Sequence, residues 1–167
     1  MKWACCLINN MKILGIDPGN SRVGWGLIQK EHGNVVFVSC GTLETRAKNQ
    51  FDKILEISGR FADLLKELEP ELIGIERLFF SKNKKTALAV AEARGVLISQ
   101  ALALKIPIYE CLPSEAKQAV TGYGLSDKKA VAGMVIRILN IKIKPEHDDA
   151  TDALAIAIAA AYLYPKL

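Results

Sequence analysis

The N-terminal part of the chain alternates short apolar runs with turn residues, a pattern that predicts β-strands. Strands are expected over Lys12–Asp17, Gly24–Gln29 and Val35–Leu43. The first connection contains Asp-Pro-Gly and the second contains Glu-His-Gly-Asn, both typical of tight reversals. The pattern therefore predicts an antiparallel meander.

The middle of the chain changes to a helical period. Hydrophobic residues recur every three or four positions over Phe51–Leu68, which predicts an amphipathic helix that ends before Pro70. The β-branched run Leu72–Ile75 predicts a short buried strand that leads directly into Glu76. A polar loop and an alanine-rich helix over about Thr86–Leu104 follow.

The last part of the chain predicts one more strand, at Ile106–Cys111, and then helices only. The helices are expected near Ser114–Thr121, Ser126–Leu139 and Asp149–Tyr162, with Ser114 and Ser126 as N-caps. Strand-helix-strand alternation after a meander implies right-handed crossovers. The predicted fold class is therefore α/β, with a mixed five-stranded sheet flanked by helices on both faces.

Length and composition favour one globular domain over residues 11–167. The chain has 167 residues, of which 50% are hydrophobic and 24% charged, which suffices for one buried core. Residues 1–10 are expected to be an N-terminal extension outside this core, because Met11 begins the first strand. The 22 Lys and Arg exceed the 18 Asp and Glu, giving a net charge of +4 that is compatible with a polyanionic partner.

Cysteine usage and hydropathy favour a cytoplasmic protein without a membrane partner. The four cysteines form no CxxC pair, so reduced thiols are expected rather than a zinc site or disulfides. The apolar stretch near the N-terminus is too short for a signal peptide. The apolar run Ala153–Tyr164 is well short of the roughly 20 residues that cross a bilayer.

Four carboxylates occupy chemically informative positions. Asp17 ends one predicted buried strand and Glu76 directly follows another, whereas Asp149 and Asp152 lie three residues apart, on one face of a predicted helix. Asp17 and Glu76 meet if the first and fourth strands are neighbours. Two like charges about 4 Å apart repel by roughly 4 kcal/mol at an effective dielectric near 20, so a cluster needs a cation. The placement predicts a site for a hard cation such as Mg²⁺ or Mn²⁺.

Each carboxylate also has a simpler interpretation. Asp17 could stabilise its turn, Asp149 could be an ordinary acid at a helix start, and Glu76 could pair with Arg77. Asp152 is the hardest to explain in this way, because it lies in an otherwise apolar helix where a lone charge is unfavourable.

Four motifs together carry a family resemblance. They are Gly-Ile-Asp-Pro-Gly, Ile-Glu-Arg-Leu-Phe-Phe-Ser-Lys-Asn, Ala-Arg-Gly-Val at Ala93–Val96, and Asp-Ala-Thr-Asp-Ala-Leu-Ala near the end. In this order and spacing they closely resemble the RuvC family of Holliday-junction resolvases, from Met11 to about Tyr162. The resemblance implies a ribonuclease H-like fold and a homodimer. It also implies a structure-selective endodeoxyribonuclease of DNA recombination and repair that nicks two opposed strands of a four-way junction, with a branch-migration complex as a further partner.

The resemblance also assigns roles to individual residues. Asp17, Glu76, Asp149 and Asp152 would be the catalytic metal ligands, although some family members have a histidine at the position of Asp149. The resemblance further implies that Phe79 stacks on an exposed DNA base. Because adjacent aromatic residues usually point in different directions, the choice between Phe79 and Phe80 stays open. Lys117 and Lys128 would lie near the scissile phosphate.

The chemistry of the residues agrees with these implied roles. Two Mg²⁺ ions about 3.5–4 Å apart can activate water and stabilise the leaving oxygen of a phosphodiester, and Mn²⁺ should substitute. Asp17 is expected to bridge them. Two alternatives stay open: a ribonuclease H-like nuclease for RNA or another branched DNA, and a junction-binding module without catalysis. The apolar side chains of the helix over Thr86–Leu104 predict contact with a second copy of the chain.

Overall fold

The structure is a computed structural model that describes residues 10–78, 84–142 and 147–165. It has the predicted α/β architecture. In chain order the elements are β1 (Asn10–Asp17), β2 (Arg22–Glu31), β3 (Asn34–Glu44), α1 (Gln50–Leu68), β4 (Leu72–Glu76), α2 (Lys84–Ala103), β5 (Ile108–Cys111), α3 (Pro113–Thr121), α4 (Lys128–Ile138) and α5 (Asp148–Leu163).

The sheet is mixed and five-stranded, in the order β3-β2-β1-β4-β5. The meander β1-β2-β3 is antiparallel, whereas β4 and β5 run parallel to β1. Because β1 and β4 are parallel neighbours, the carboxyl ends of both strands lie at one edge of the sheet. The first and fourth strands are thus neighbours, which is the condition under which Asp17 and Glu76 were expected to meet.

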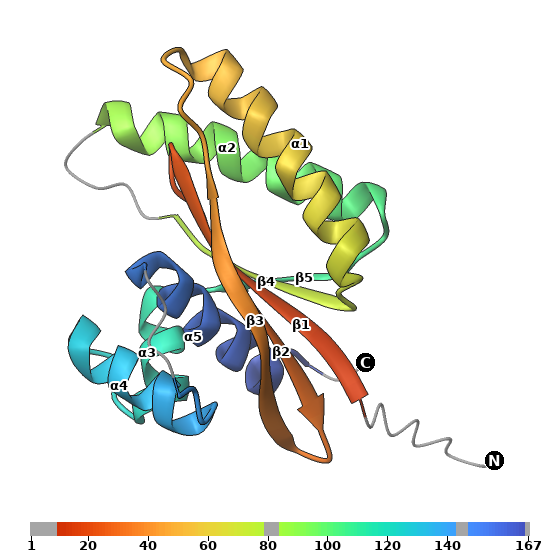
Figure 1. The fold of residues 1–167 in the computed structure, drawn as a ribbon. Coiled ribbons are helices and arrows are strands. Elements are labelled where there is room, and N and C mark those ends of the chain that lie inside the picture. The colour runs from red at the N-terminus through yellow and green to blue at the C-terminus, as the bar shows by residue number, and fades with distance from the viewer. Residues whose placement is uncertain (1–9, 79–83, 143–146, 166–167) are drawn as a thin grey trace.

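Helices cover both faces of the sheet (Figure 1). On one face, α1 and α2 bury Phe61 and Leu97 against strand residues such as Leu14 and Leu27. On the other face, α5 lies against the sheet, and α3 and α4 pack beside it. Within the described part of the chain, no helix is long and apolar enough to span a membrane.

Several element boundaries differ from the predicted ones. β1 begins at Asn10, so one residue of the expected N-terminal extension pairs in the sheet, opposite Glu31. The prediction of Ser114 as an N-cap is wrong: Leu112 is the cap, Pro113 begins α3, and the Glu115 carboxylate accepts a hydrogen bond from the Leu112 amide at 2.8 Å.

The prediction of Ser126 as an N-cap is also wrong. Asp127 caps α4 by accepting a hydrogen bond from the Ala130 amide at 2.7 Å. The Ser126 hydroxyl instead donates to the Tyr123 carbonyl at 2.9 Å and lies 2.8 Å from the Thr121 hydroxyl. These turn contacts satisfy Ser126, and the carboxylate one residue later takes the capping position.

Glycines let α5 lie unusually close to the sheet. A methyl group on Gly15 would come within 1.9 Å of the Ala153 carbonyl oxygen and 2.6 Å of the Ala157 amide nitrogen. A methyl group on Gly24 would come within 2.2 Å of the Asp149 carbonyl oxygen. The absence of side chains on these strand residues therefore sets the height of α5, and of its acidic residues, above β1 and β2.

Gly15→Ala should destabilise the protein, because its methyl group meets α5 backbone atoms that cannot rotate away. Overpacking of this kind typically costs about 1–3 kcal/mol, and contact with main chain favours the upper end. Urea unfolding measures the effect. Gly59→Ala in α1 is the matched control: no atom lies within 4 Å of the added methyl group, and alanine in a helix interior should stabilise by up to about 1 kcal/mol. Equal effects of the two substitutions would contradict the packing argument.

Candidate active site

The parallel pairing of β1 and β4 brings Asp17 and Glu76 together. Ile16 pairs with Ile75, so the next residue of each strand is a carboxylate at the same edge of the sheet. The two carboxyl groups are close enough that the charge of Glu76 helps to raise the pKa of Asp17.

Helix α5 adds a third carboxylate, since it crosses the sheet over β1 and β2. Asp152 in its first turns lines the same pocket as Asp17 and Glu76, and the pocket has a volume of about 190 Å³. The rest of the lining comes from α3, α4 and α5: Pro113, Ala116, Lys117, Lys128, Val131, Ala155 and Ile156. The pocket therefore combines three acids and two lysines with apolar walls.

Burial and mutual repulsion make this cluster unfavourable when fully ionised. Burial, followed by repulsion from Glu76, Asp152 and Asp149, raises the pKa of Asp17 to about 7. Burial and the charge of Asp152 also raise the pKa of Glu76, although Lys128 and the neighbouring Asp17 side chain oppose the shift. A bound cation would offset this repulsion.

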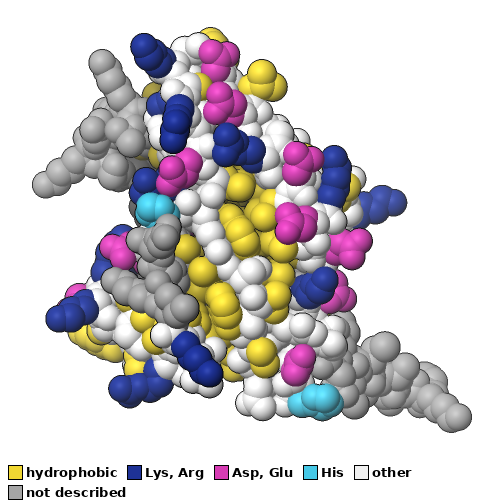
Figure 2. Space-filling view, in the orientation of Figure 1, with side chains coloured by type: hydrophobic (Ala, Val, Ile, Leu, Met, Phe, Trp, Pro, Cys, Tyr) yellow, Lys and Arg dark blue, Asp and Glu magenta, His cyan; other side chains and the backbone are white. Residues whose placement is uncertain are grey.

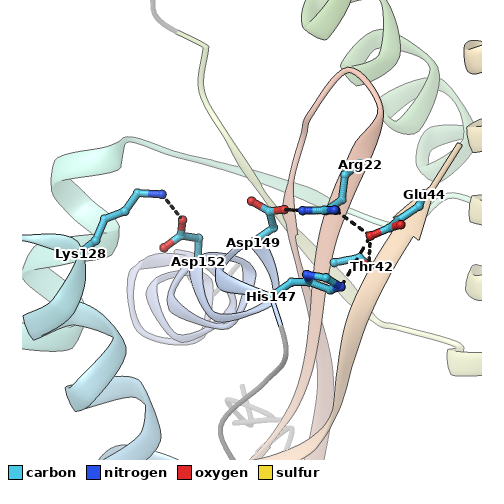
Figure 3. A network of polar contacts seen from close by, with 7 residues as sticks. All are labelled: Arg22, Thr42, Glu44, Lys128, His147, Asp149 and Asp152. Atoms are coloured by element: carbon cyan, nitrogen blue, oxygen red, sulfur yellow. Dashed lines mark hydrogen bonds and ion pairs between the residues drawn. The ribbon is translucent and has the colours of Figure 1, made fainter. Parts of the chain in front are cut away.

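Both predicted lysines lie at the pocket. Lys128, the first residue of α4, donates a hydrogen bond from Nζ to Asp152 Oδ2 at 2.9 Å (Figure 3). This bond and the charge of Asp152 raise the pKa of Lys128, so the ammonium stays protonated. Lys117 enters from α3. The lysines place positive charge next to the carboxylates, where a phosphate group would need it.

Asp149 is paired away from this pocket. Its Oδ2 accepts a hydrogen bond from Arg22 Nη1 at 3.5 Å, and Arg22 Nε donates to Glu44 at 2.7 Å. His147 Nε2 also lies 3.6 Å from Glu44. Figure 3 shows the two α5 carboxylates paired in opposite directions, Asp152 with Lys128 and Asp149 with Arg22.

Sequence reasoning missed Arg22 and Glu44. The two residues pair across β2 and β3 because the antiparallel register places them opposite each other. Both residues lie just outside the predicted strands Gly24–Gln29 and Val35–Leu43, and the register that pairs them depends on a bulge near Leu27 that no local pattern indicated.

The donor set fits a hard divalent cation, though the side chains are not arranged around one. Within residues 10–78, 84–142 and 147–165, no three Asp, Glu, His or Cys side chains are close enough to hold one ion. The oxygens of Asp17, Glu76 and Asp152 are nevertheless in one pocket, with Asp149 near enough to raise the pKa of Asp17. Carboxylate oxygens are the ligands that Mg²⁺ and Mn²⁺ prefer.

Two further expectations concern the surface. Phe79 and Phe80 lie outside the described residues, so the choice between them stays a prediction. On the face in Figure 2, side chains of Lys and Arg alternate with those of Asp and Glu around a hydrophobic middle, so this face carries no single basic patch.

Cys40 and Cys111, the two cysteines in the described part, are free thiols.

Comparisons with known proteins identify the family. The model of the family described as "Crossover junction endodeoxyribonuclease RuvC" matches residues 13–160. The chain is 42% identical to the RuvC of Syntrophomonas wolfei over 155 residues, which cover 92% of this chain and 90% of that one. It is 43% identical to the RuvC of Thermosipho melanesiensis over 148 residues, covering 88% and 94% of the two chains.

A solved structure agrees with the sequence matches. The T. thermophilus RuvC in complex with a Holliday junction substrate superimposes with a TM-score of 0.85 and 30% identity, covering 92% of this chain and 94% of that chain. The ribonuclease H-like fold implied by the motifs is thereby confirmed. This chain belongs to the RuvC family of crossover junction endodeoxyribonucleases.

Proposed function

We propose that this chain is a structure-selective endodeoxyribonuclease that resolves Holliday junctions in DNA recombination and repair by two symmetrical nicks. The observation that carries the proposal is the pocket in which Asp17, Glu76 and Asp152 meet beside Lys117 and Lys128. Membership of the RuvC family supports it, as does the Holliday junction substrate in the T. thermophilus structure.

The pocket residues would have two roles in phosphodiester hydrolysis: the carboxylates bind metal ions and the lysines bind the phosphate. Asp17, Glu76 and Asp152 would hold two Mg²⁺ or Mn²⁺ ions, with Asp17 bridging, and Asp149 would join them after leaving Arg22. Bound ions supply an activated water and neutralise charge on the phosphate. Lys128 can exchange its bond with Asp152 for a phosphate oxygen, and Lys117 offers a second cation from α3. This exchange would free the Asp152 carboxylate when substrate binds.

Cleavage of a mobile synthetic four-way junction tests the proposal. With Mg²⁺, paired nicks at symmetrical positions on opposed strands are expected, and with EDTA none. Flap DNA and an RNA-DNA hybrid of the same sequence are the matched substrates. Preferred cleavage of either would favour another ribonuclease H-like nuclease, whereas Mg²⁺-independent junction binding without any nicking would favour a binding module.

The proposed enzyme is a homodimer, because two active sites related by a two-fold axis would match the symmetry of a four-way junction. Apolar side chains near the start of α2 and of α1 support this: Leu88 is 63% exposed and Phe51 is 85% exposed. Sedimentation at micromolar concentration is expected to give a dimer, and Leu88→Glu should shift it toward monomer and uncouple the two nicks. A parental monomer that still makes paired nicks would refute this.

A branch-migration complex as a further partner and a cytoplasmic location belong to the same proposal.

Phe79→Ala should impair cleavage far more than folding, if Phe79 stacks on a base at the crossover. Stacking on an aromatic side chain is typically worth about 1–3 kcal/mol per base. Single-turnover nicking and the melting temperature, measured on the same preparation, test this role. Phe80→Ala is the control that should lower the melting temperature instead. Parental nicking by Phe79→Ala would show that the stacking role is misassigned.

A further inference from the structure

Arg94 in α2 joins three elements that meet beside the active site. Its side chain is only 15% exposed. The guanidinium donates a hydrogen bond from Nε to the Glu76 main-chain carbonyl at 3.0 Å, and from Nη2 to the Glu110 carboxylate. Arg94 belongs to the Ala93–Val96 motif, for which the proposed chemistry assigns no task. A mostly buried arginine with these two partners has a defined position.

Arg94 binds the main chain of Glu76, whose carboxylate lines the pocket. Glu76 is the last residue of β4, and the next amide, Arg77, donates to the Cys111 carbonyl of β5 at 2.9 Å. The sheet therefore holds the chain just after Glu76, while Arg94 holds the Glu76 carbonyl from the side of α2. Together these contacts restrict the main chain from which the Glu76 carboxylate extends into the pocket.

The fork of the guanidinium explains why an arginine is suited to this position. A lysine ammonium is a compact donor, whereas the planar guanidinium can donate to a carbonyl and to a carboxylate in different directions at once. Glu110 anchors the far side of the fork and also lies 4.0 Å from Arg77 Nε. Loss of Arg94 would thus free the Glu76 carbonyl and leave Glu110 with the more exposed Arg77.

We propose that Arg94, held by Glu110, is a positioning residue that fixes Glu76 in the geometry needed to hold a divalent cation. The inference rests on the proposed metal site. Outer groups that orient metal ligands commonly change metal affinity by 10–100-fold when they are removed. Arg94 touches neither the pocket nor the substrate in this role and acts through the Glu76 backbone alone.

Binding of Mn²⁺ to the DNA-free protein, followed by electron paramagnetic resonance, tests the proposal without reference to activity. Arg94→Gln should weaken Mn²⁺ binding roughly 10-fold. In cleavage assays it should raise the Mg²⁺ concentration for half-maximal rate by a similar factor, while the rate at saturating Mg²⁺ stays near the parental value. Arg60→Gln, at an exposed position of α1, is the control and should leave both quantities unchanged.

Further variants separate positioning from loss of fold. Arg94→Lys and Glu110→Gln each keep part of the arrangement and should give intermediate Mn²⁺ affinities. In a Glu76→Gln background, Arg94→Gln should have no further effect on Mn²⁺ binding. Parental affinity in folded Arg94→Gln, or equal losses with and without Glu76, would overturn the inference. Absence of Mn²⁺ binding by the parental protein would instead overturn the proposed metal site.

Discussion

Asp17→Asn is expected to abolish junction cleavage and, at the same time, to make the metal-free protein more stable at pH 8. Loss of this proposed metal ligand should reduce cleavage by more than 100-fold, since loss of outer groups alone commonly costs 10–100-fold. The gain in stability follows from the raised pKa of Asp17, about 7, because burial and the neighbouring carboxylates disfavour its charged form. Asparagine has a similar size and no charge to bury.

The sign of the pH dependence follows from the same shift. The folded protein keeps a proton on Asp17 up to about pH 7, whereas the unfolded chain releases it near its ordinary value of 3.8. Between these values the folded state binds more protons, so this group's contribution to stability falls as the pH rises. The advantage of the variant should therefore be absent near pH 4 and largest above pH 7.

Melting temperatures in EDTA at pH 4.5 and pH 8 measure this effect. A shift of a few degrees at pH 8 is expected, because about 1 kcal/mol moves the midpoint of a domain this size by roughly 2–4 °C. Asp63→Asn, at an exposed α1 position, is the control without such a pH dependence. A variant that melts below the parent at pH 8, or that cleaves at the parental rate, would contradict the role of Asp17.

Asp152→Asn is expected to eliminate cleavage while junction binding survives or becomes tighter. The substitution keeps the size of the side chain but removes one charge from the pocket and from the bond with Lys128. Cleavage should again fall by more than 100-fold, because loss of outer groups alone commonly costs 10–100-fold and Asp152 is proposed to hold the metal directly. Lys128 would become available to a phosphate, which explains why binding should not weaken.

Gel-shift binding in EDTA and single-turnover nicking in Mg²⁺ separate the two effects. Asp127→Asn is the matched control, since it removes a charge next to Lys128 but keeps a good N-cap for α4. It should nick at the parental rate. Wild-type-like nicking by Asp152→Asn would remove this residue from the catalytic site, and loss of junction binding would point to misfolding rather than chemistry.

The convergence of Asp17 and Glu76 was partly predictable, because local patterns place each carboxylate at the end of a strand. Apolar runs with turn residues located the strands, but only the folded sheet makes β1 and β4 parallel neighbours. Parallel neighbours end at the same edge, so two carboxylates that follow such strands must meet. Asp152 was predictable for a related reason, since a charge in an apolar helix needs a partner.

The partners of the charged groups were not predictable in the same way. Arg22 binds Asp149 from 127 residues away in sequence, and Arg94 reaches Glu76 from another layer of the fold. Both contacts depend on strand register and on how closely a helix approaches the sheet. Side-chain period and residue type carry no information about either quantity.

By itself, then, the sequence determined the α/β class and the mixed five-stranded sheet, and it singled out the four carboxylates, because periodicity and burial cost act on neighbouring residues. Tertiary structure alone decided which basic side chains pair with the two α5 carboxylates. The spacing between α5 and β1 is set by the close approach at Gly15, and it places Asp152 in the pocket while Asp149 lies against Arg22. Such distances arise from packing between segments far apart in the chain, so only the folded structure contains them.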